Sequence, residues 1–401
     1  MSSAALSLDA LRALLPAEQE AIGVAHTLPE ILQQPRAWLD TLERVHEERP
    51  ALTSLLHASG LTGAHPPEVV LIGAGSSDFA AQLVAPAFRQ AFGARTQALA
   101  STDLLTQAQS LLSPGTNYLF VWFSRSGTTP EALELLEALE LQFAGAHHLF
   151  ITCNAQGAFA RRLRSARSTC LTLADAVHDR GLAMTSSFTS MTLAGQLVAF
   201  GDPVGESVSA LSVAAERLFE QAASDLFRLA QRRHSSAFFL GSGSLKAAAG
   251  ECALKLVELS AGRIKTRFDS FLGVRHGPLA SLDRESTLVG FLSRSPAERS
   301  YELELVREVH DKGLAGAIAL VTPGAEPSLA ALADVCVELR IPAHLPELFR
   351  PLLDVVTGQL LALFSSLTLA IRPDSPSASG AISRVVQRIR PRTADEGEEA
   401  R

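Results

Sequence analysis

The stretch EVVLIGAGSSDFAAQLVAPAF, Glu68 to Phe88, decides the fold of this 401-residue chain. Its apolar run from Val69 to Ile72 predicts a buried strand, Gly73 and Gly75 a tight turn, and the following residues a helix. The same order of strand, glycine turn and helix returns in SAFFLGSGSLKAAAGECALKL, which starts at Ser236 and has its glycines 168 residues further on. One unit of the chain is therefore predicted to occur twice.

Two further pairs of segments repeat at almost the same distance. FSRSGTTPEALELLEAL, from Phe123, matches LSRSPAERSYELELVREV, from Leu292, 169 residues later. FITCN, from Phe150, matches LVTPG, from Leu320, 170 residues later. Three ordered matches at one spacing indicate two copies of a whole domain, because solenoid repeats have a much shorter period.

Each copy alternates short apolar strands with helices, which predicts an α/β fold with parallel sheets. We expect two tandem three-layer α/β/α sandwiches of the Rossmann or flavodoxin type. The predicted boundaries are a helical extension over 1–55, domains over 56–215 and 216–390, and a disordered acidic tail over 391–401. A long helix from Leu345 to Thr368 closes the second copy. Ligands of such sheets bind beyond the carboxyl ends of the strands, where both glycine turns fall.

Composition excludes several classes of protein. The chain is 47% apolar and 19% charged, its net charge is −7, and it has no dense Lys/Arg tract, so nucleic acid is not an expected partner. Its four scattered cysteines lack metal spacing and predict free thiols in a reducing compartment. We see no secretory signal and no apolar run near the ~20 residues of a membrane helix. These features predict a soluble cytoplasmic protein that contacts no membrane.

The loop SRSGTT, from Ser124 to Thr129, joins a predicted strand to a helix that starts at Pro130. A helix start offers unpaired N–H groups and a partial positive charge, and the hydroxyls add further donors. The loop therefore suits a phosphate, and since it lacks the Lys of a nucleotide P-loop we expect a phosphomonoester such as a sugar phosphate. The alternative is a well-capped helix after a serine-rich turn.

The second copy lacks this loop chemistry. Pro296 replaces Gly127, and Ala297 and Glu298 replace the two threonines. We therefore expect one phosphate site per chain, with the second copy supplying other groups.

Glu251, Lys255 and Glu258 share one face of the helix predicted after Gly243. They are either a solvated ladder of charges or part of a site. Small apolar neighbours and the position at a strand's carboxyl end favour the site, where a partly desolvated carboxylate can serve as a general base.

His276, in the turn RHGP, is either a surface histidine or a group that moves protons near neutral pH. The hydroxyl cluster in GLAMTSSFTSMT either caps a helix or contacts a ligand. No histidine shows metal spacing.

Taken together, these motifs resemble the sugar isomerase (SIS) domain superfamily. GLAMTSSFTSMT, DSFLGVRHGP, RPDSPSASGAISRVV and ILQQPRAWL resemble its D-galactosamine-6-phosphate deaminase/isomerase group, also known as tagatose-6-phosphate ketose/aldose isomerase. The resemblance spans about residues 24 to 390, and it implies two SIS domains and no cofactor or metal. Glucosamine-6-phosphate deaminases of the SIS type are similar, and the isomerase half of glucosamine-6-phosphate synthase is more distant.

The resemblance also implies roles for individual residues. Glu258 would move a proton between C1 and C2, Lys255 would steady the developing enolate oxygen, and Glu251 would support Lys255. His276 would open the sugar ring from a partner subunit, which implies a homodimer with shared sites. The implied substrate and phosphate ligands are Ser77, Ser124, Arg125, Ser126, Thr129 and the backbone of Ala183 and Met184. Arg384 lies near the position of a catalytic lysine in the synthase but is not its clear equivalent.

The expected function is conversion of galactosamine 6-phosphate or glucosamine 6-phosphate to a ketose 6-phosphate and ammonia. Two alternatives stay open. The same proton transfer on a sugar phosphate without an amine gives plain aldose–ketose isomerisation. A non-catalytic sugar-phosphate sensor would keep the Ser/Thr loop but has no need of Glu258, Lys255 and His276.

Overall fold

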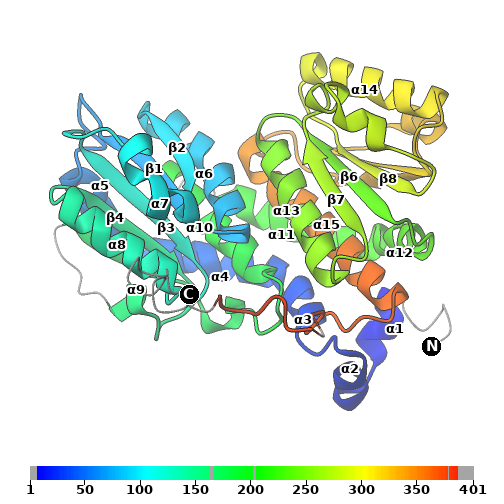
Figure 1. The fold of residues 1–401 in the computed structure, drawn as a ribbon, viewed down its shortest axis with the longest axis horizontal. Coiled ribbons are helices and arrows are strands. Elements are labelled where there is room, and N and C mark those ends of the chain that lie inside the picture. The colour runs from blue at the N-terminus through cyan, green and yellow to red at the C-terminus, as the bar shows by residue number, and fades with distance from the viewer. Residues whose placement is uncertain (1–6, 162–166, 202–204, 378, 387–401) are drawn as a thin grey trace, which may run out of the picture.

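The computed structural model describes residues 7–161, 167–201, 205–377 and 379–386. It contains two parallel five-stranded sheets that lie side by side (Figure 1). The predicted acidic tail lies outside the described residues. The expected α/β fold with parallel sheets is confirmed.

The first sheet has the order β2-β1-β3-β4-β5, and the second, read in the matching direction, has the order β7-β6-β8-β9-β10. Both are the same arrangement, so the duplication seen in the sequence is present in the topology. The strands are β1 (Glu68–Gly73), β2 (Thr96–Ala100), β3 (Tyr118–Ser124), β4 (His147–Thr152), β5 (Ser168–Thr172), β6 (Ser236–Gly241), β7 (Lys265–Asp269), β8 (Ser286–Phe291), β9 (Ala317–Thr322) and β10 (Val335–Glu338).

The two glycine turns repeat in backbone geometry as well as in sequence. Gly75 has φ +57° and ψ −125°, and Gly243 has φ +56° and ψ −126°. Only glycine adopts this region at little cost, so each turn depends on its glycine. Each turn starts a helix, α6 (Ser76–Phe92) in the first copy and α13 (Ser244–Leu259) in the second.

Helices cover both faces of each sheet. Alternate residues of β3 point to opposite faces: Leu119 and Val121 join a core shared with the second copy, while Phe120 and Trp122 join an outer core with α7 and α8. The remaining helices of the two copies are α7 (Ser101–Leu111), α8 (Pro130–Gln142), α9 (Ala158–Arg161), α10 (Ser186–Phe200), α11 (Gly205–Gln221), α12 (Ala223–Gln231), α14 (Pro296–Asp311) and α15 (Pro351–Thr368).

The helix α13 lies in the shared core, between α6 of the first copy and α15. At Gly250 an added Cβ would come within 2.4 Å of the Phe79 ring of α6, and at Gly358 an added Cβ would come within 2.3 Å of Cys252. The absence of side chains at these two glycines lets the three helices approach closely. The helix α13 of the second copy therefore packs directly against α6 of the first copy.

The closing helix starts later than the sequence suggests. A 3₁₀ turn over Glu347–Phe349 precedes α15. Pro346 and Pro351 have no backbone N–H to donate, so they interrupt a continuous helix there. The stretch Glu347–Thr368 is long and apolar enough to cross a membrane by length and composition, but its apolar window is 100% buried inside the protein. It is accordingly a core helix of the fold.

The N-terminal extension consists of α1 (Leu8–Ala13), α2 (Pro16–Ile22), α3 (Thr27–Leu32), α4 (Gln34–Glu47) and α5 (Arg49–Ala58). It runs from α1 and α2, below the second copy in this view, past α3 and α4 to α5 beside the first copy, and the C-terminal segment passes from α15 by α3 toward the first copy (Figure 1). Asp374 of that segment accepts hydrogen bonds from the backbone N–H groups of His26 and Thr27 at the start of α3. The two ends of the chain are therefore joined to each other.

Candidate active site

A cavity of about 220 Å³ lies at the carboxyl ends of β1 and β3. Six of the seven predicted ligands line it: Met184, and the five that follow β1 and β3, which are Ser77, Ser124, Arg125, Ser126 and Thr129. These five meet there because β1 and β3 are neighbours in the parallel sheet, so the turns that follow them lie at the same edge. The structure thus gathers the predicted phosphate ligands around one hollow.

Two hydrogen bonds within the SRSGTT loop fix its conformation beside this cavity. The Ser124 hydroxyl accepts a hydrogen bond from the Gly127 N–H at 3.1 Å, and the Ser126 hydroxyl accepts one from the Thr128 N–H at 3.3 Å. Thr129 occupies the N-cap of α8, but its side chain makes no capping hydrogen bond. Pro130 has no N–H and the Ala132 N–H donates to Thr129 O at 3.1 Å, so the first turn offers a ligand few donors, although the positive helix end still favours an anion.

Arg125 brings a buried positive charge to the cavity. The residue is 6% exposed, and its guanidinium donates to two carbonyls, Leu182 O at 3.3 Å and Arg384 O at 2.6 Å. Burial lowers its pKa from the usual value, as the nearby Arg384 also does, while Asp179 opposes the shift. It forms no ion pair with any described residue, so its charge is available to a bound anion.

A second cavity of about 520 Å³ adjoins the first, and Arg125, Met184 and Arg384 line both. Glu258, from α13 of the second copy, lines this second cavity together with Ser76 of the first copy. A carboxylate from one copy therefore opens into a space next to the phosphate loop of the other copy.

The charged face of α13 is not a solvated ladder. Glu251 and Lys255 are fully buried, and the Glu258 side chain is 21% exposed. The Lys255 ammonium donates to Glu258 Oε2 at 2.5 Å and to the Ser76 hydroxyl at 2.9 Å, and it lies 3.5 Å from Glu251 Oε1. Lys255 thus joins the two copies and holds Glu258 at the cavity wall.

The pKa values follow from this burial. Desolvation raises the pKa of Glu251 to about 8, although the charge of Lys255 opposes the shift. Burial alone lowers the pKa of Lys255, but Glu251 and Glu258 outweigh it and the net shift is upward. Glu251 therefore keeps its proton to a higher pH than an ordinary glutamate, and Lys255 is a cation that pairs with Glu258.

Glu251→Gln is expected to remove part of the pH dependence of stability. The pKa of Glu251 is raised from 4.5 in the unfolded chain to about 8 in the folded protein, so between these values the folded state holds the extra proton. The free energy of unfolding of the wild type therefore falls as pH rises from 4.5 to 8, by a few kcal/mol from this group. Urea unfolding at pH 5 to 8, followed by the fluorescence of the buried Trp38 and Trp122, should show a smaller fall in the variant.

The matched control for this experiment is Glu137→Gln on α8, because Glu137 is exposed. It should keep the wild-type slope. If Glu251→Gln also kept that slope, Glu251 would be ionised in the folded protein and the assignment above would be wrong.

The remaining predicted residues fall in different places. Met184 lines both cavities, whereas Ala183 is buried and lines neither. His276 is exposed and follows the 3₁₀ turn Gly273–Arg275, beyond β7, and it lines neither cavity. A single chain therefore does not bring His276 to Glu258. Among the described residues there is no cluster of three or more His, Cys, Asp or Glu suited to a metal ion.

Sequence reasoning did not assign two residues that the structure places at the site. Ser76 receives the hydrogen bond of Lys255, and Arg384 lines both cavities. Arg384 donates through Nε to Asp179 O at 2.8 Å and through an Nη to His178 O at 3.4 Å. The one available signal for Ser76 was its place beside Ser77 after the first glycine turn.

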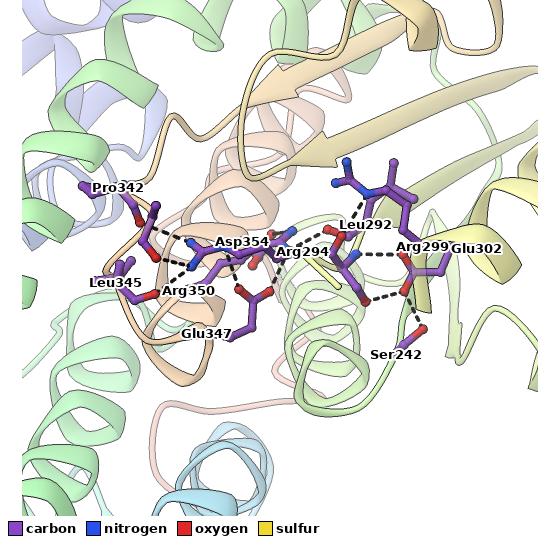
Figure 2. A network of polar contacts seen from close by, with 12 residues as sticks. Ser242, Leu292, Arg294, Arg299, Glu302, Pro342, Leu345, Glu347, Arg350 and Asp354 are labelled. Carbon is purple, nitrogen blue, oxygen red and sulfur yellow. Dashed lines mark hydrogen bonds and ion pairs between the residues drawn. The ribbon is translucent and has the colours of Figure 1, made fainter. Parts of the chain in front are cut away.

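In the second copy, a carboxylate of the protein fills the position that corresponds to the phosphate loop (Figure 2). Glu302 of α14 accepts hydrogen bonds from the Ser293 N–H at 2.7 Å, the Ser293 hydroxyl at 2.5 Å and the Ser242 hydroxyl at 2.6 Å. Ser293 corresponds to Ser124 in the duplication, and Glu302 is 1% exposed. The expected loss of the second phosphate site therefore has a structural counterpart, an internal anion in its place.

Glu302→Ala is expected to lower the free energy of unfolding by about 2–4 kcal/mol, because it leaves buried donors of Ser242 and Ser293 without a partner. Urea unfolding measures this change. Glu304→Ala, at an exposed position of the same helix, should stay within about 0.5 kcal/mol of the wild type. Equal stabilities of the two variants would contradict the role given to Glu302.

Comparisons with known proteins find one domain family and relatives of nearly the same length. The SIS domain model matches residues 64–200. A Streptomyces coelicolor protein, provisionally named D-galactosamine-6-phosphate deaminase AgaS, is 37% identical over 94% of this chain and 96% of its own length. D-galactosamine-6-phosphate deaminase AgaS of Escherichia coli O157:H7 is 33% identical over 90% of this chain and 94% of its own. The crystal structure of tagatose-6-phosphate ketose/aldose isomerase from Escherichia coli has a TM-score of 0.80 and 30% identity, covering 89% of this chain and 95% of that one.

Proposed function

We propose, from the premise that this chain belongs to the SIS-domain family of AgaS D-galactosamine-6-phosphate deaminases, that it converts an amino-sugar 6-phosphate to a ketose 6-phosphate and ammonia. The substrates in view are galactosamine 6-phosphate and glucosamine 6-phosphate. One observation carries the proposal: the Ser/Thr loop of the first copy and Glu258 of the second copy line adjoining cavities that share Arg125. An anion tether next to a carboxylate base is what proton transfer along a sugar phosphate requires.

The reaction follows from the placement of these groups. The phosphate binds at the loop Ser124–Thr129 beside Arg125, and Glu258 takes the C2 proton of the open-chain sugar and returns a proton to C1. Lys255 is fully buried and lines neither cavity, so in this scheme it would steady the negative charge on O1 as a buried cation behind Glu258 and not by direct contact. As C1 is protonated, a proton also passes from the C2 amine to O1, which leaves a C1 hydroxymethyl group and a C2 imine. The imine adds water and releases ammonia, so the reaction is both an isomerisation and a hydrolysis.

Glu251 has a supporting role in this scheme. Because burial makes its carboxyl hold a proton more readily than an ordinary glutamate, it limits the negative charge in the buried cluster around Lys255. Glu258 can then act as a base while Lys255 keeps its charge.

We further propose that the protein acts as a homodimer, with His276 of one subunit opening the sugar ring in the site of the other. Two observations support it. His276 is exposed and away from both cavities of its own chain, and Phe268 on the edge strand β7 nearby is 41% exposed.

Plain aldose–ketose isomerisation is the second candidate, favoured by the similarity to the E. coli tagatose-6-phosphate ketose/aldose isomerase. The test incubates the purified protein with galactosamine 6-phosphate, glucosamine 6-phosphate and tagatose 6-phosphate, and follows ammonia and sugar products together. Ammonia and ketose in equal amounts support the deaminase. Aldose from tagatose 6-phosphate, with no ammonia from either amino sugar, supports the isomerase. No product from any of the three would overturn both.

A further inference from the structure

The loop from His178 to Met184 supports both arginines of the site. Leu182 and Met184 line the larger cavity, and Met184 also lines the smaller one. The carbonyl of Leu182 accepts the hydrogen bond of Arg125, and the carbonyls of His178 and Asp179 accept those of Arg384. The position of this loop therefore sets where the two guanidinium groups lie.

A residue of the N-terminal extension forms hydrogen bonds with the backbone of this loop. Glu30 of α3 accepts hydrogen bonds through Oε1 from the Arg180 N–H at 2.5 Å and the Gly181 N–H at 3.2 Å. The next N–H, of Leu182, donates to the carbonyl of Asp374 at 3.2 Å. Three successive amides of the loop are thus bound by the two ends of the chain.

The contact between the loop and α3 is close. An added Cβ at Gly181 would lie 2.9 Å from Thr27 Oγ1 and 3.0 Å from Glu30 Oε2, so the backbone of the turn packs directly on this helix. Glu30 is 8% exposed and forms no ion pair with any described residue. Its strong acceptor oxygens are directed at the loop amides alone.

The charged groups that face Glu30 are acidic. Asp179, in the loop before α10, and Asp374, after α15, both add to the upward shift that burial gives to the pKa of Glu30, which reaches about 7. The Asp179 carboxylate is itself bound to the start of α10 by the N–H groups of Thr185 and Ser187. A buried acid beside two others costs stability, and the loop amides are the groups that offset this cost.

From these contacts we propose that Glu30 is a positioning residue of the substrate site: it fixes the Arg180–Leu182 turn, and the turn fixes Arg125 beside the phosphate loop. The inference rests on the proposed function, since it assigns Arg125 to a bound sugar phosphate. It gives the N-terminal extension a direct part in substrate binding, although the extension lines neither cavity.

The test compares Glu30→Ala, Glu30→Gln and the wild type as full-length proteins, in the ammonia assay with galactosamine 6-phosphate. Glu30→Ala should raise KM about tenfold and change kcat less than about threefold, because a tether is weakened and not the base. Glu30→Gln should stay within about twofold of the wild-type KM, because its side-chain oxygen still accepts from the two amides. Glu43→Ala, at an exposed position of α4, is the matched control and should leave KM unchanged.

A second variant covers the case in which Glu30→Ala does not fold. Gly181→Ala places a methyl group against Thr27 and Glu30 and should raise KM in the same direction. A folded Glu30→Ala with the wild-type KM would overturn the inference, and so would a Glu30→Gln as impaired as Glu30→Ala.

A readout without turnover separates this inference from the proposed function. Inorganic phosphate should raise the thermal midpoint of the wild type and of Glu30→Gln, and raise it less in Glu30→Ala. If the wild type releases no ammonia but shows this pattern, the deaminase proposal fails and the role of Glu30 stands. If phosphate stabilises all three proteins equally, the role of Glu30 is wrong whatever the wild type catalyses.

Discussion

Glu258→Gln should lower kcat by about 10²- to 10⁴-fold, the range that a positioned general base contributes. The amide keeps the size of the carboxyl and can still accept from Lys255, but it cannot take the C2 proton. The phosphate loop is untouched, since Glu258 lines only the larger cavity. Substrate should therefore bind with little change, and calorimetric titration of galactosamine 6-phosphate into the variant measures this directly.

A matched variant on the same helix separates loss of the base from damage to α13. Lys246→Gln removes a charge at the exposed first turn of α13, where Lys246 pairs with Asp269, and it should keep wild-type turnover. A Glu258→Gln variant that retained more than about a tenth of wild-type kcat would show that another group moves the proton. A variant that lost binding as well as turnover would assign Glu258 to substrate recognition instead.

The double change Ser124→Ala and Ser126→Ala should raise KM for a sugar phosphate about 100-fold or more. Both residues line the smaller cavity, and each hydroxyl also accepts a backbone N–H of the loop, so the change removes two donors and loosens the loop. Hydrogen bonds to a charged group are worth about 1.5–3 kcal/mol each, which corresponds to at least tenfold for each hydroxyl lost. Steady-state kinetics with saturation curves extended to high substrate measure the effect.

The duplicated sequence supplies the control for this experiment. Ser295 is the counterpart of Ser126 in the second copy, is half-buried, and lines neither cavity of the site. Ser295→Ala should leave KM within about twofold of the wild type. Equal effects of the Ser124/Ser126 and Ser295 variants would place the phosphate elsewhere.

Much of the fold could be predicted because local patterns of residues carry it. Strand, glycine turn and helix follow one another within some twenty residues, and the pattern at Gly75 recurs at Gly243 with nearly the same dihedral angles. The SRSGTT loop could be recognised for the same reason, because its hydroxyl and N–H donors all lie within six residues at the end of one strand. The phosphate site proposed for it follows from the ends of β3 and α8, whereas the position of the Arg125 side chain depends on the distant carbonyls of Leu182 and Arg384.

Contacts between distant segments could not be predicted in this way. Lys255 binds Ser76 across 179 positions, and Arg384 donates to Asp179 across 205. The hydrogen bonds of Glu30 to the Arg180 turn span 150 positions. Periodicity identifies which face of a helix is unusual, as it did for Glu251, Lys255 and Glu258, but the partner of that face depends on how the two copies pack.

The carboxylate of Glu302 in the second copy has a consequence for the history of the chain. Restoring the glycine and threonines at 296 to 298 would rebuild the outline of an anion loop, yet Glu302 would still occupy Ser242 and Ser293. Removing Glu302 first would cost stability before any ligand could bind. Neither change alone would therefore give the second copy an anion site, so Glu302 keeps the two copies functionally unequal.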